Sequence, residues 1–215
     1  MEIYETEEEQ VAALKAWWKE NGKATMIGLG LGVAVILGWN YWQDYKKDRA
    51  VQASGLYSQL LKAVEAGKKD SVEKLSERMS TQFNGTDYAA YSGLMAAKVK
   101  AQQGDLAGAK GILEKIAAES NKELSNIARI RLVRLMLANK EYEQGLKLIN
   151  DVDPAASASF SGHYDELVGD LYVALDRLDQ ARTAYESALR NGYQSPLLQM
   201  KIDDLTLPYR IESKK

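Results

Sequence analysis

The sequence predicts an all-α protein with a single transmembrane helix followed by a solenoid of helix pairs. Three observations support this fold class: residues 24–42 carry no charged side chain, an alanine-rich pattern recurs at a fixed interval, and the alternation typical of β-strands is missing. All three prolines lie at or after residue 154, so no proline interrupts a helix in the first two thirds of the chain.

The apolar run from Ala24 to Trp42 is the strongest local signal. Its nineteen residues would extend about 28 Å as a helix, close to the hydrocarbon thickness of a bilayer. A buried helix of a soluble protein is seldom apolar on every face. A cleaved signal peptide has a basic start and small residues at its cleavage site, whereas this leader is acidic and the run ends in aromatic residues. We therefore predict a transmembrane helix over residues 24–43.

Residues 1–23 form a short tail with features of its own. Thr6 and Glu9 have the spacing of a capping box, and Asn21-Gly22 is predicted to end the helix that follows it. The apolar side of that helix consists of Val11, Leu14, Trp17 and Trp18. The helix either lies at the membrane surface or docks a partner. Three lysines precede the span and three basic residues follow it closely, so the positive-inside rule leaves the orientation open.

Small residues recur inside the span. Gly28, Gly30, Gly32, Ala34 and Gly38 form overlapping pairs four residues apart, a spacing that lets another helix approach the backbone closely. We expect a contact with a neighbouring membrane helix through Gly28, Gly32, Gly30 and Ala34. A nucleotide-binding glycine motif is excluded because valine stands at the position of its third glycine and no strand precedes it.

The chain after the span repeats itself. The segments GDLAGAKGILEKI, KEYEQGLKLINDV and DRLDQARTAYESA superimpose, with Ala109, Gly145 and Ala181 at intervals of 36 residues. Such an interval is typical of two-helix units that bury their apolar faces only against neighbouring units. The predicted repeat domain covers residues 44–205. Its predicted helix pairs are about 48–82, 90–123, 126–159 and 162–195, followed by a capping helix at 196–205.

The last of these units resembles the tetratricopeptide repeat. Its small, aromatic and alanine positions are occupied by Gly169, Tyr172, Ala181, Tyr185 and Ala188. The two aromatic residues expected in the first helix are absent from units 90–123 and 126–159, so these units are divergent. The resemblance implies a tetratricopeptide-like α-solenoid after the membrane helix.

The whole chain also resembles one particular family. The matching segments are MEIYETEEEQV, Trp17-Trp18 to Gly22-Lys23, the glycine-bearing span, Gly38-Trp39-x-Tyr41-Trp42 and Met200-Lys201-Ile202-Asp203-Asp204-Leu205. These segments are similar to the YfgM family, the bitopic ancillary subunits of the bacterial Sec translocon. The resemblance implies a cytoplasmic tail, a periplasmic repeat domain, the inner membrane as location, and SecYEG and a membrane-anchored periplasmic prolyl-isomerase-like chaperone as partners. Other periplasmic chaperones are further candidates, and residues 206–215 have no counterpart that we can place.

The resemblance to the tetratricopeptide repeat also assigns a partner-binding groove to the first helices of the pairs. The groove residues are Tyr91, Leu94 and Lys98, then Ile127, Ile130 and Arg134, then His163, Glu166 and Asp170. Each set recurs at i, i+3 and i+7 and so shares one side of its helix. The alternative is that the apolar members only fill the solenoid and that the charged members are solvated.

Composition argues against an enzyme. The chain has no cysteine, a single histidine and a net charge of −2, and it lacks the nucleophile, zinc-protease and P-loop motifs. We expect no cofactor, no metal site and no nucleic-acid partner. The leading functional prediction is a membrane-tethered protein-binding module that links SecYEG to periplasmic chaperones for secreted and outer-membrane proteins. The alternative is a self-associating scaffold of the cell envelope.

Overall fold

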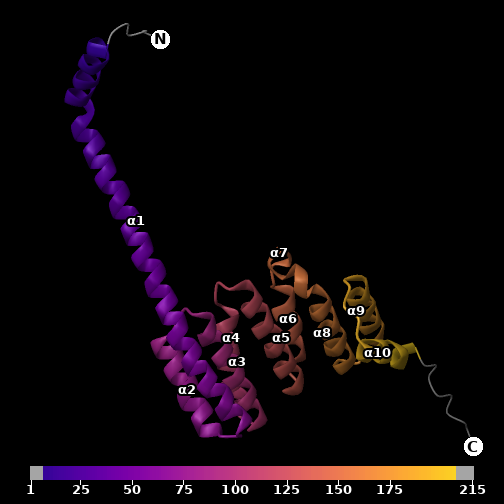
Figure 1. Ribbon diagram of the computed structural model, residues 1–215. Coiled ribbons are helices and arrows are strands. Elements are labelled where there is room, and N and C mark those ends of the chain that lie inside the picture. Colours follow the sequence, from indigo (N-terminus) through magenta and orange to yellow (C-terminus); the bar gives the residue numbers. More distant parts are fainter. Residues whose placement is uncertain (1–6, 207–215) are drawn as a thin grey trace, which may run out of the picture. The chain divides into compact units, whose positions relative to one another are not determined.

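The computed structural model of the protein describes residues 7–206 (Figure 1). The chain divides into two compact units, Met1–Gln52 and Ala53–Lys215, and the boundary falls inside helix α1 (Glu7–Glu65). We call the described part of the second unit the repeat domain. The predicted helix cap at Thr6 and the tail after residue 206 lie outside the described residues.

In the first unit, helix α1 continues through the predicted break at Asn21-Gly22. The prediction of a separate tail helix was therefore wrong, and local hydrogen bonds explain why. The Asn21 side chain donates to the Trp17 carbonyl at 3.1 Å, and the Thr25 hydroxyl donates to the Asn21 carbonyl at 3.0 Å. Gly22 lies under the Trp18 ring, where a β-carbon would be only 3.1 Å from the ring. Both residues of the expected stop signal are thus accommodated within the helix.

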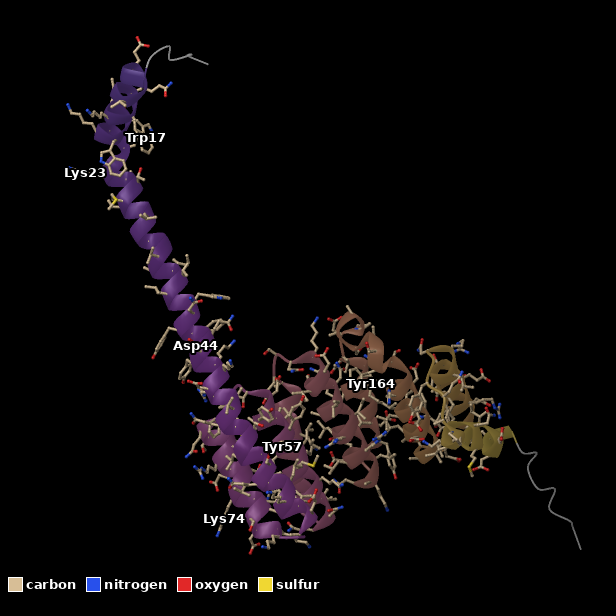
Figure 2. All side chains as sticks on the ribbon, in the orientation of Figure 1. Trp17, Lys23, Asp44, Tyr57, Lys74 and Tyr164 are labelled. Carbon is tan, nitrogen blue, oxygen red and sulfur yellow. The ribbon has the colours of Figure 1, made fainter. Side chains whose placement is uncertain are left out.

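The apolar run lies on this helix. Of the helices in residues 7–206, only α1 is long and apolar enough to cross a membrane, as judged by length and composition. Its apolar window is 6% buried, whereas the core helix of a soluble protein is mostly buried. Between the labelled residues Lys23 and Asp44, its side chains project outward from the helix (Figure 2).

The repeat domain consists of antiparallel helix pairs in chain order (Figure 1). They are the end of α1 with α2 (Lys69–Gln82), α3 (Asp87–Gln102) with α4 (Leu106–Ala117), α5 (Lys122–Ala138) with α6 (Tyr142–Asn150), and α8 (Ser161–Ala174) with α9 (Leu178–Arg190), before the final helix α10 (Pro196–Thr206). An extra short helix α7 (Pro154–Ser157) and a 3-10 turn (Ala158–Phe160) interrupt the region that was predicted as one pair over 126–159. Asp153 caps α7 by accepting a hydrogen bond from Ala155, and Pro154 occupies the first helical position, so a new helical turn starts there.

The same backbone conformation recurs in the turn within each pair. Gly67, Gly104, Lys140 and Asp176 all have positive φ angles, of 65°, 85°, 63° and 59°. They lie 36 or 37 residues apart, and each follows the end of a first helix. This left-handed residue reverses the chain, and glycine adopts it without steric strain. The four turns therefore repeat a single geometry although their sequences differ.

Packing within and between neighbouring pairs buries a series of apolar clusters along the solenoid. The small residues Ala109, Gly145 and Ala181 are buried at equivalent places in α4, α6 and α9. Successive first helices contact each other directly, α3 against α5 and α5 against α8, and contacts between successive second helices are sparser. The first helices therefore lie on the inside of the solenoid curve. We call the surface of α1 from Ala53, α3, α5 and α8 the first-helix face.

Candidate protein-binding site

The structure divides the predicted groove residues into exposed and buried groups. Tyr91, Lys98 and Arg134 are exposed on the first-helix face, and Ile127, His163 and Asp170 are partly buried. Leu94, Ile130 and Glu166 are buried. These last three are not accessible to a partner, which corrects the sequence-based assignment for them.

The geometry of a helix accounts for this division. Successive residues are about 100° apart, so position i+7 lies about 20° from position i, whereas position i+3 lies about 60° away. In all three predicted sets the buried residue is the one at i+3. Leu94 packs in a core cluster with Leu113 and Leu132, and Ile130 packs in another with Tyr164 and Leu167. The middle position of each set therefore faces the adjoining helix rather than the open surface.

Three tyrosines form a cluster on this face, with Tyr91 exposed and Tyr57 and Tyr88 partly buried, and only Tyr91 was predicted. The ring centroid of Tyr57 lies 5.8 Å from that of Tyr88 and 6.0 Å from that of Tyr91, and the Tyr88 and Tyr91 centroids are 6.2 Å apart. Burial and the neighbouring Tyr91 raise the pKa of the Tyr57 hydroxyl. Tyr57 comes from the end of α1 and is labelled in Figure 2. Its partners lie more than thirty residues further along the chain, so a local pattern could not have revealed the cluster.

Arg131 of α5 interacts electrostatically with Tyr57 of this cluster, and Arg134 interacts in the same way with Arg131. The Arg131 side chain donates through Nη1 to the Leu94 carbonyl at 3.1 Å, which fixes it against α3. Burial lowers the pKa of Arg131, the positive charge of Arg134 lowers it further, and Tyr57 opposes both effects. Arg131 was missed because the predicted i, i+3, i+7 set on α5 passed over it. We call Tyr57, Tyr88, Tyr91, Arg131 and Arg134 the tyrosine–arginine surface.

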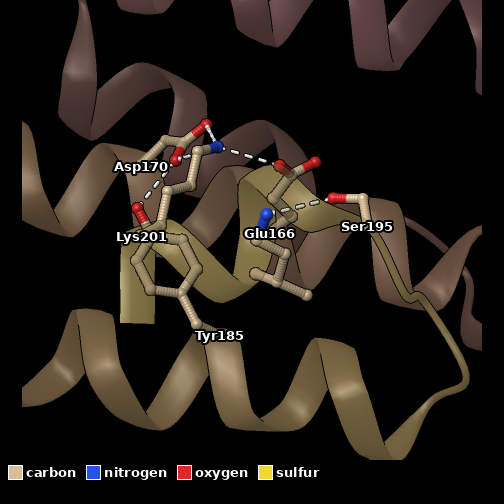
Figure 3. A network of polar contacts seen from close by, with 6 residues as sticks. Glu166, Asp170, Tyr185, Ser195 and Lys201 are labelled. Carbon is tan, nitrogen blue, oxygen red and sulfur yellow. Dashed lines mark hydrogen bonds and ion pairs between the residues drawn. The ribbon is translucent and has the colours of Figure 1, made fainter. Parts of the chain in front are cut away.

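The predicted acidic residues of α8, Glu166 and Asp170, form contacts within the repeat domain. Lys201 of α10 donates to Glu166 and to Asp170, both at 2.8 Å, and the Tyr185 hydroxyl donates to Asp170 at 2.7 Å (Figure 3). Ser195 caps α10 by accepting a hydrogen bond from the Leu198 amide at 3.0 Å. These contacts hold α10 against α8 and α9 and leave little of Glu166 available for a ligand.

The single histidine is packed among aromatic rings. The His163 ring centroid lies 4.4 Å from that of Tyr193 and 6.3 Å from that of Phe160. Within residues 7–206, no group of three or more histidine, cysteine, aspartate or glutamate side chains is arranged to hold a metal ion.

Two hollows lie away from the tyrosine–arginine surface. One, of about 590 Å³, lies between α2 and α4 over a floor of small residues of α3, Ala89, Gly93 and Ala96. The other, of about 520 Å³, is lined by Val168, Tyr172 and residues of α6. Charged residues line both hollows, among them ion-paired side chains such as Lys100, which bonds Glu73 at 2.8 Å. The first hollow is a groove between the second helices α2 and α4, and the second lies between α6 and α8.

The first unit offers a membrane-facing surface. The Trp39 and Trp42 ring centroids are 5.3 Å apart, and the Lys46 ammonium lies 4.0 Å from the centroid of the Trp42 ring. From Trp18 to Trp39 the helix rises about 32 Å, which matches the thickness of a bilayer's hydrocarbon core. The small residues of the predicted helix contact are exposed between these aromatic groups, and a β-carbon added at Gly28 would meet no other atom of the chain within 4 Å.

The chain matches known proteins over almost its whole length. A family model described as a tetratricopeptide repeat-like domain matches residues 15–207. A protein of Escherichia coli K12 named ancillary SecYEG translocon subunit is 31% identical over 211 residues, which cover 96% of this chain and 100% of that protein. A protein of Haemophilus influenzae with the same name is 32% identical over 205 residues, covering 93% and 97%.

One solved structure shows the same fold at low sequence identity. It is a double mutant described as MamA RS-1 ArsTM, which superimposes with a TM-score of 0.55 at 15% identity. The match covers 71% of this chain and 82% of that one. The likeness supports the helical-repeat architecture alone.

Proposed function

The chain belongs to the family of ancillary SecYEG translocon subunits, with the tetratricopeptide repeat-like domain of that family, and we propose that it is a membrane-tethered protein-binding subunit of the SecYEG translocon. The observation that carries the proposal is the combination of one apolar helix with a repeat domain that exposes aromatic and basic side chains on its first-helix face. The first part would keep the protein in the membrane, and the second would bind another protein.

The membrane helix is proposed to bind beside the channel. Its small residues are exposed and would let a translocon helix pack close to the backbone. Tryptophans near both ends of the apolar run would sit at the two headgroup layers and set the depth of the helix. The bilayer is thus a partner of this unit as well.

The repeat domain is proposed to hold a membrane-anchored periplasmic prolyl-isomerase-like chaperone. Helical solenoids bind protein segments along the inner surface of their curve. In this chain that surface carries Tyr91 and Arg134 in exposed positions. Tyrosine and arginine are enriched among the residues that dominate the energy of protein interfaces. The tail before the span would then be cytoplasmic and the repeat domain periplasmic, so that the chaperone meets chains as they leave the channel.

Co-purification of the tagged full chain in a mild detergent tests this proposal. We expect SecYEG and the chaperone to be recovered together with the wild-type protein. Arg134→Glu and Tyr91→Ala change exposed side chains, so they should reduce recovery of the chaperone and leave SecYEG, helicity and melting temperature nearly unchanged. Lys115→Gln, which alters an exposed lysine on a second helix, is the matched control and should retain both partners.

Two results would contradict the proposal. Recovery of only further copies of the same chain would indicate the alternative function, a self-associating scaffold of the cell envelope. The exposed apolar residues Leu197 and Met200 on α10 are where such self-association would be tested first. Intact chaperone recovery with both surface variants would show that the first-helix face is not the binding surface.

A further inference from the structure

The tyrosine–arginine surface contains basic groups that lack the partners found elsewhere in the domain. The paired basic side chains are Lys100, Lys110, Arg177, Arg182, Arg190 and Lys201, each with a carboxylate. Among the residues that the structure describes, no carboxylate lies within ion-pairing distance of Arg131 or Arg134. Two like charges on neighbouring turns of one helix repel each other, so an anion between them would be stabilising.

Of the two arginines, Arg131 is better suited to bind a carboxylate, because its side chain is partly buried and held in place by a hydrogen bond. One of its five N–H groups donates to the Leu94 carbonyl, and a guanidinium can use the remaining donors for a bidentate contact with a carboxylate. A partly desolvated cation without a counter-ion is unfavourable, and the pKa of Arg131 is correspondingly lowered, mainly by burial. A carboxylate would remove this penalty.

The adjacent tyrosines provide an apolar platform. Their rings contact one another, and Tyr91 remains 40% exposed. Aromatic rings pack well against other aromatic or large apolar side chains. The cluster therefore offers an apolar contact near the Arg131 guanidinium, which in turn interacts with Arg134.

We propose that the tyrosine–arginine surface binds an extended protein segment in which an aspartate or glutamate lies next to a large apolar side chain. The carboxylate contacts Arg131 and Arg134, and the apolar side chain packs on Tyr57, Tyr88 and Tyr91. This inference rests on the proposed protein-binding function and specifies the kind of segment recognised. The surface lies on first helices that are followed by α8, so a bound chain can continue past it. The proposed occupant is an internal segment, whose side-chain carboxylate supplies the negative charge.

A defined set of peptides tests whether the surface prefers a segment that combines acidic and large apolar side chains. The full chain in lipid nanodiscs is titrated against fluorescent twelve-residue peptides that are capped at both ends, with glycine and serine around a central Phe-Glu-Phe-Glu, Phe-Gln-Phe-Gln or Ala-Glu-Ala-Glu. We expect fluorescence anisotropy to show about tenfold tighter binding of the first peptide than of either other peptide, because the charge-assisted contact and the aromatic contact are both needed. Protein-free nanodiscs provide the background.

Variants test which residues recognise the carboxylate of the peptide and which recognise its apolar side chain. Arg131→Gln with Arg134→Gln should abolish discrimination between glutamate and glutamine peptides, and the exposed Arg134→Gln alone should weaken it in a chain that folds normally. Tyr91→Ala should reduce discrimination between phenylalanine and alanine peptides. Lys115→Gln with Lys147→Gln removes two exposed charges from second helices and should retain both preferences.

The inference is overturned if no peptide binds, if glutamate and glutamine peptides bind equally, or if the arginine variants keep the wild-type preference. The inference is also overturned if a twelve-nucleotide oligothymidylate binds more tightly than any peptide, because the surface would then bind nucleic acid. SecYEG recovery is measured on the same variants. If SecYEG is retained while the peptides fail, only the inferred segment is wrong, whereas loss of SecYEG from the wild-type protein contradicts the proposed function itself.

Discussion

Lys201 lies 2.8 Å from Glu166, although 35 residues separate them along the chain. That separation is close to one repeat. Glu166 is 4% exposed, so its carboxylate depends on the lysine of α10 for a counter-charge. Helix α10 thus packs against α9 and is linked to α8 by an ion pair whose two residues are about one repeat apart in the sequence.

The first prediction concerns this ion pair between α10 and α8. Lys201→Met should destabilise the protein by about 3 kcal/mol, because it leaves two carboxylates unpaired in a partly buried site. Hydrogen exchange should show the largest increase in the amides of α10, since the repeat units further away keep their own contacts. Burial by itself lowers the pKa of Lys201, but the hydrogen bonds to Asp170 and Glu166 outweigh it and hold that pKa above its usual value.

A compensating variant provides the control for that prediction. Adding Glu166→Gln and Asp170→Asn to Lys201→Met removes the uncompensated charges and should restore most of the lost stability. Equal destabilisation of the single and the triple variant would mean that packing of the lysine stem, rather than charge, holds α10 in place.

The second prediction concerns alkaline pH. Burial raises the pKa of the Tyr164 hydroxyl from 10.0 to about 12, and nearby Arg129 opposes the shift only in part. The folded protein therefore binds this proton more tightly than the unfolded chain does. Its contribution, about 2 to 3 kcal/mol, is complete below pH 10 and is lost as the pH rises through about 12. Urea unfolding measured at several pH values between 8 and 11.5 should show this decline.

Two phenylalanine variants isolate the Tyr164 effect. Tyr164→Phe should be less stable at neutral pH by about 1 to 2 kcal/mol, because Asn126 loses the hydroxyl that donates to it at 2.7 Å. The same variant should have a shallower alkaline decline than the wild type. Tyr41→Phe changes a tyrosine that is 77% exposed and should retain the wild-type slope. An unchanged slope for Tyr164→Phe would assign the decline to other groups, among them Tyr185, whose pKa burial also raises.

The third prediction concerns a close approach between helices α8 and α9. A β-carbon at Gly169 would overlap the Tyr185 ring, so Gly169→Ala should destabilise the domain by about 1 to 3 kcal/mol. Gly111→Ala is the matched control, because a β-carbon there meets nothing within 4 Å and alanine favours the helix by about 0.5 to 1 kcal/mol. Thermal melting should lower the midpoint for the first variant and maintain or raise it for the second. Similar midpoints would contradict the packing.

The repeat architecture could be predicted because its signals are local. The small residue Gly169 and the aromatic Tyr185 occupy repeat positions that depend on the helical period, and the structure packs them together. The 36-residue interval likewise placed Ala109, Gly145 and Ala181 at equivalent buried sites. These features follow from the chain's own periodicity, and they required no knowledge of which distant residues meet.

The candidate binding surface could be predicted only in part because it depends on contacts between repeats. Tyr57 belongs to the first helix pair, far in sequence from Tyr88 and Tyr91, and Arg131 is held in position by the Leu94 carbonyl of another helix. Glu166 had the right helical spacing for a groove residue, but α10 covers it. Asn21-Gly22 resembles a helix end, yet side-chain hydrogen bonds within α1 accommodate it. In each case a tertiary or medium-range contact overrode the local pattern.

The fourth prediction concerns orientation. If the repeat domain is periplasmic, a protease added to spheroplasts should digest the chain after Trp42 and leave an epitope near Met1 intact. Detergent lysis should expose both sides and serves as the control for protease access. Protection of the repeat domain with loss of the epitope would reverse the proposed orientation, and a soluble form released during normal growth would contradict the membrane anchor.

The last prediction concerns the small residues of the span. Gly28→Leu with Gly32→Leu should weaken recovery of SecYEG, because two large side chains prevent a neighbouring helix from approaching the backbone. The variant should still insert, since leucine is more hydrophobic than glycine and added β-carbons at both positions meet no atoms of the chain itself. Val33→Leu with Ile36→Leu adds or retains bulk at positions that are already large and should preserve SecYEG recovery. Equal recovery with the glycine variant and with this control would show that the translocon is bound through other parts of the protein.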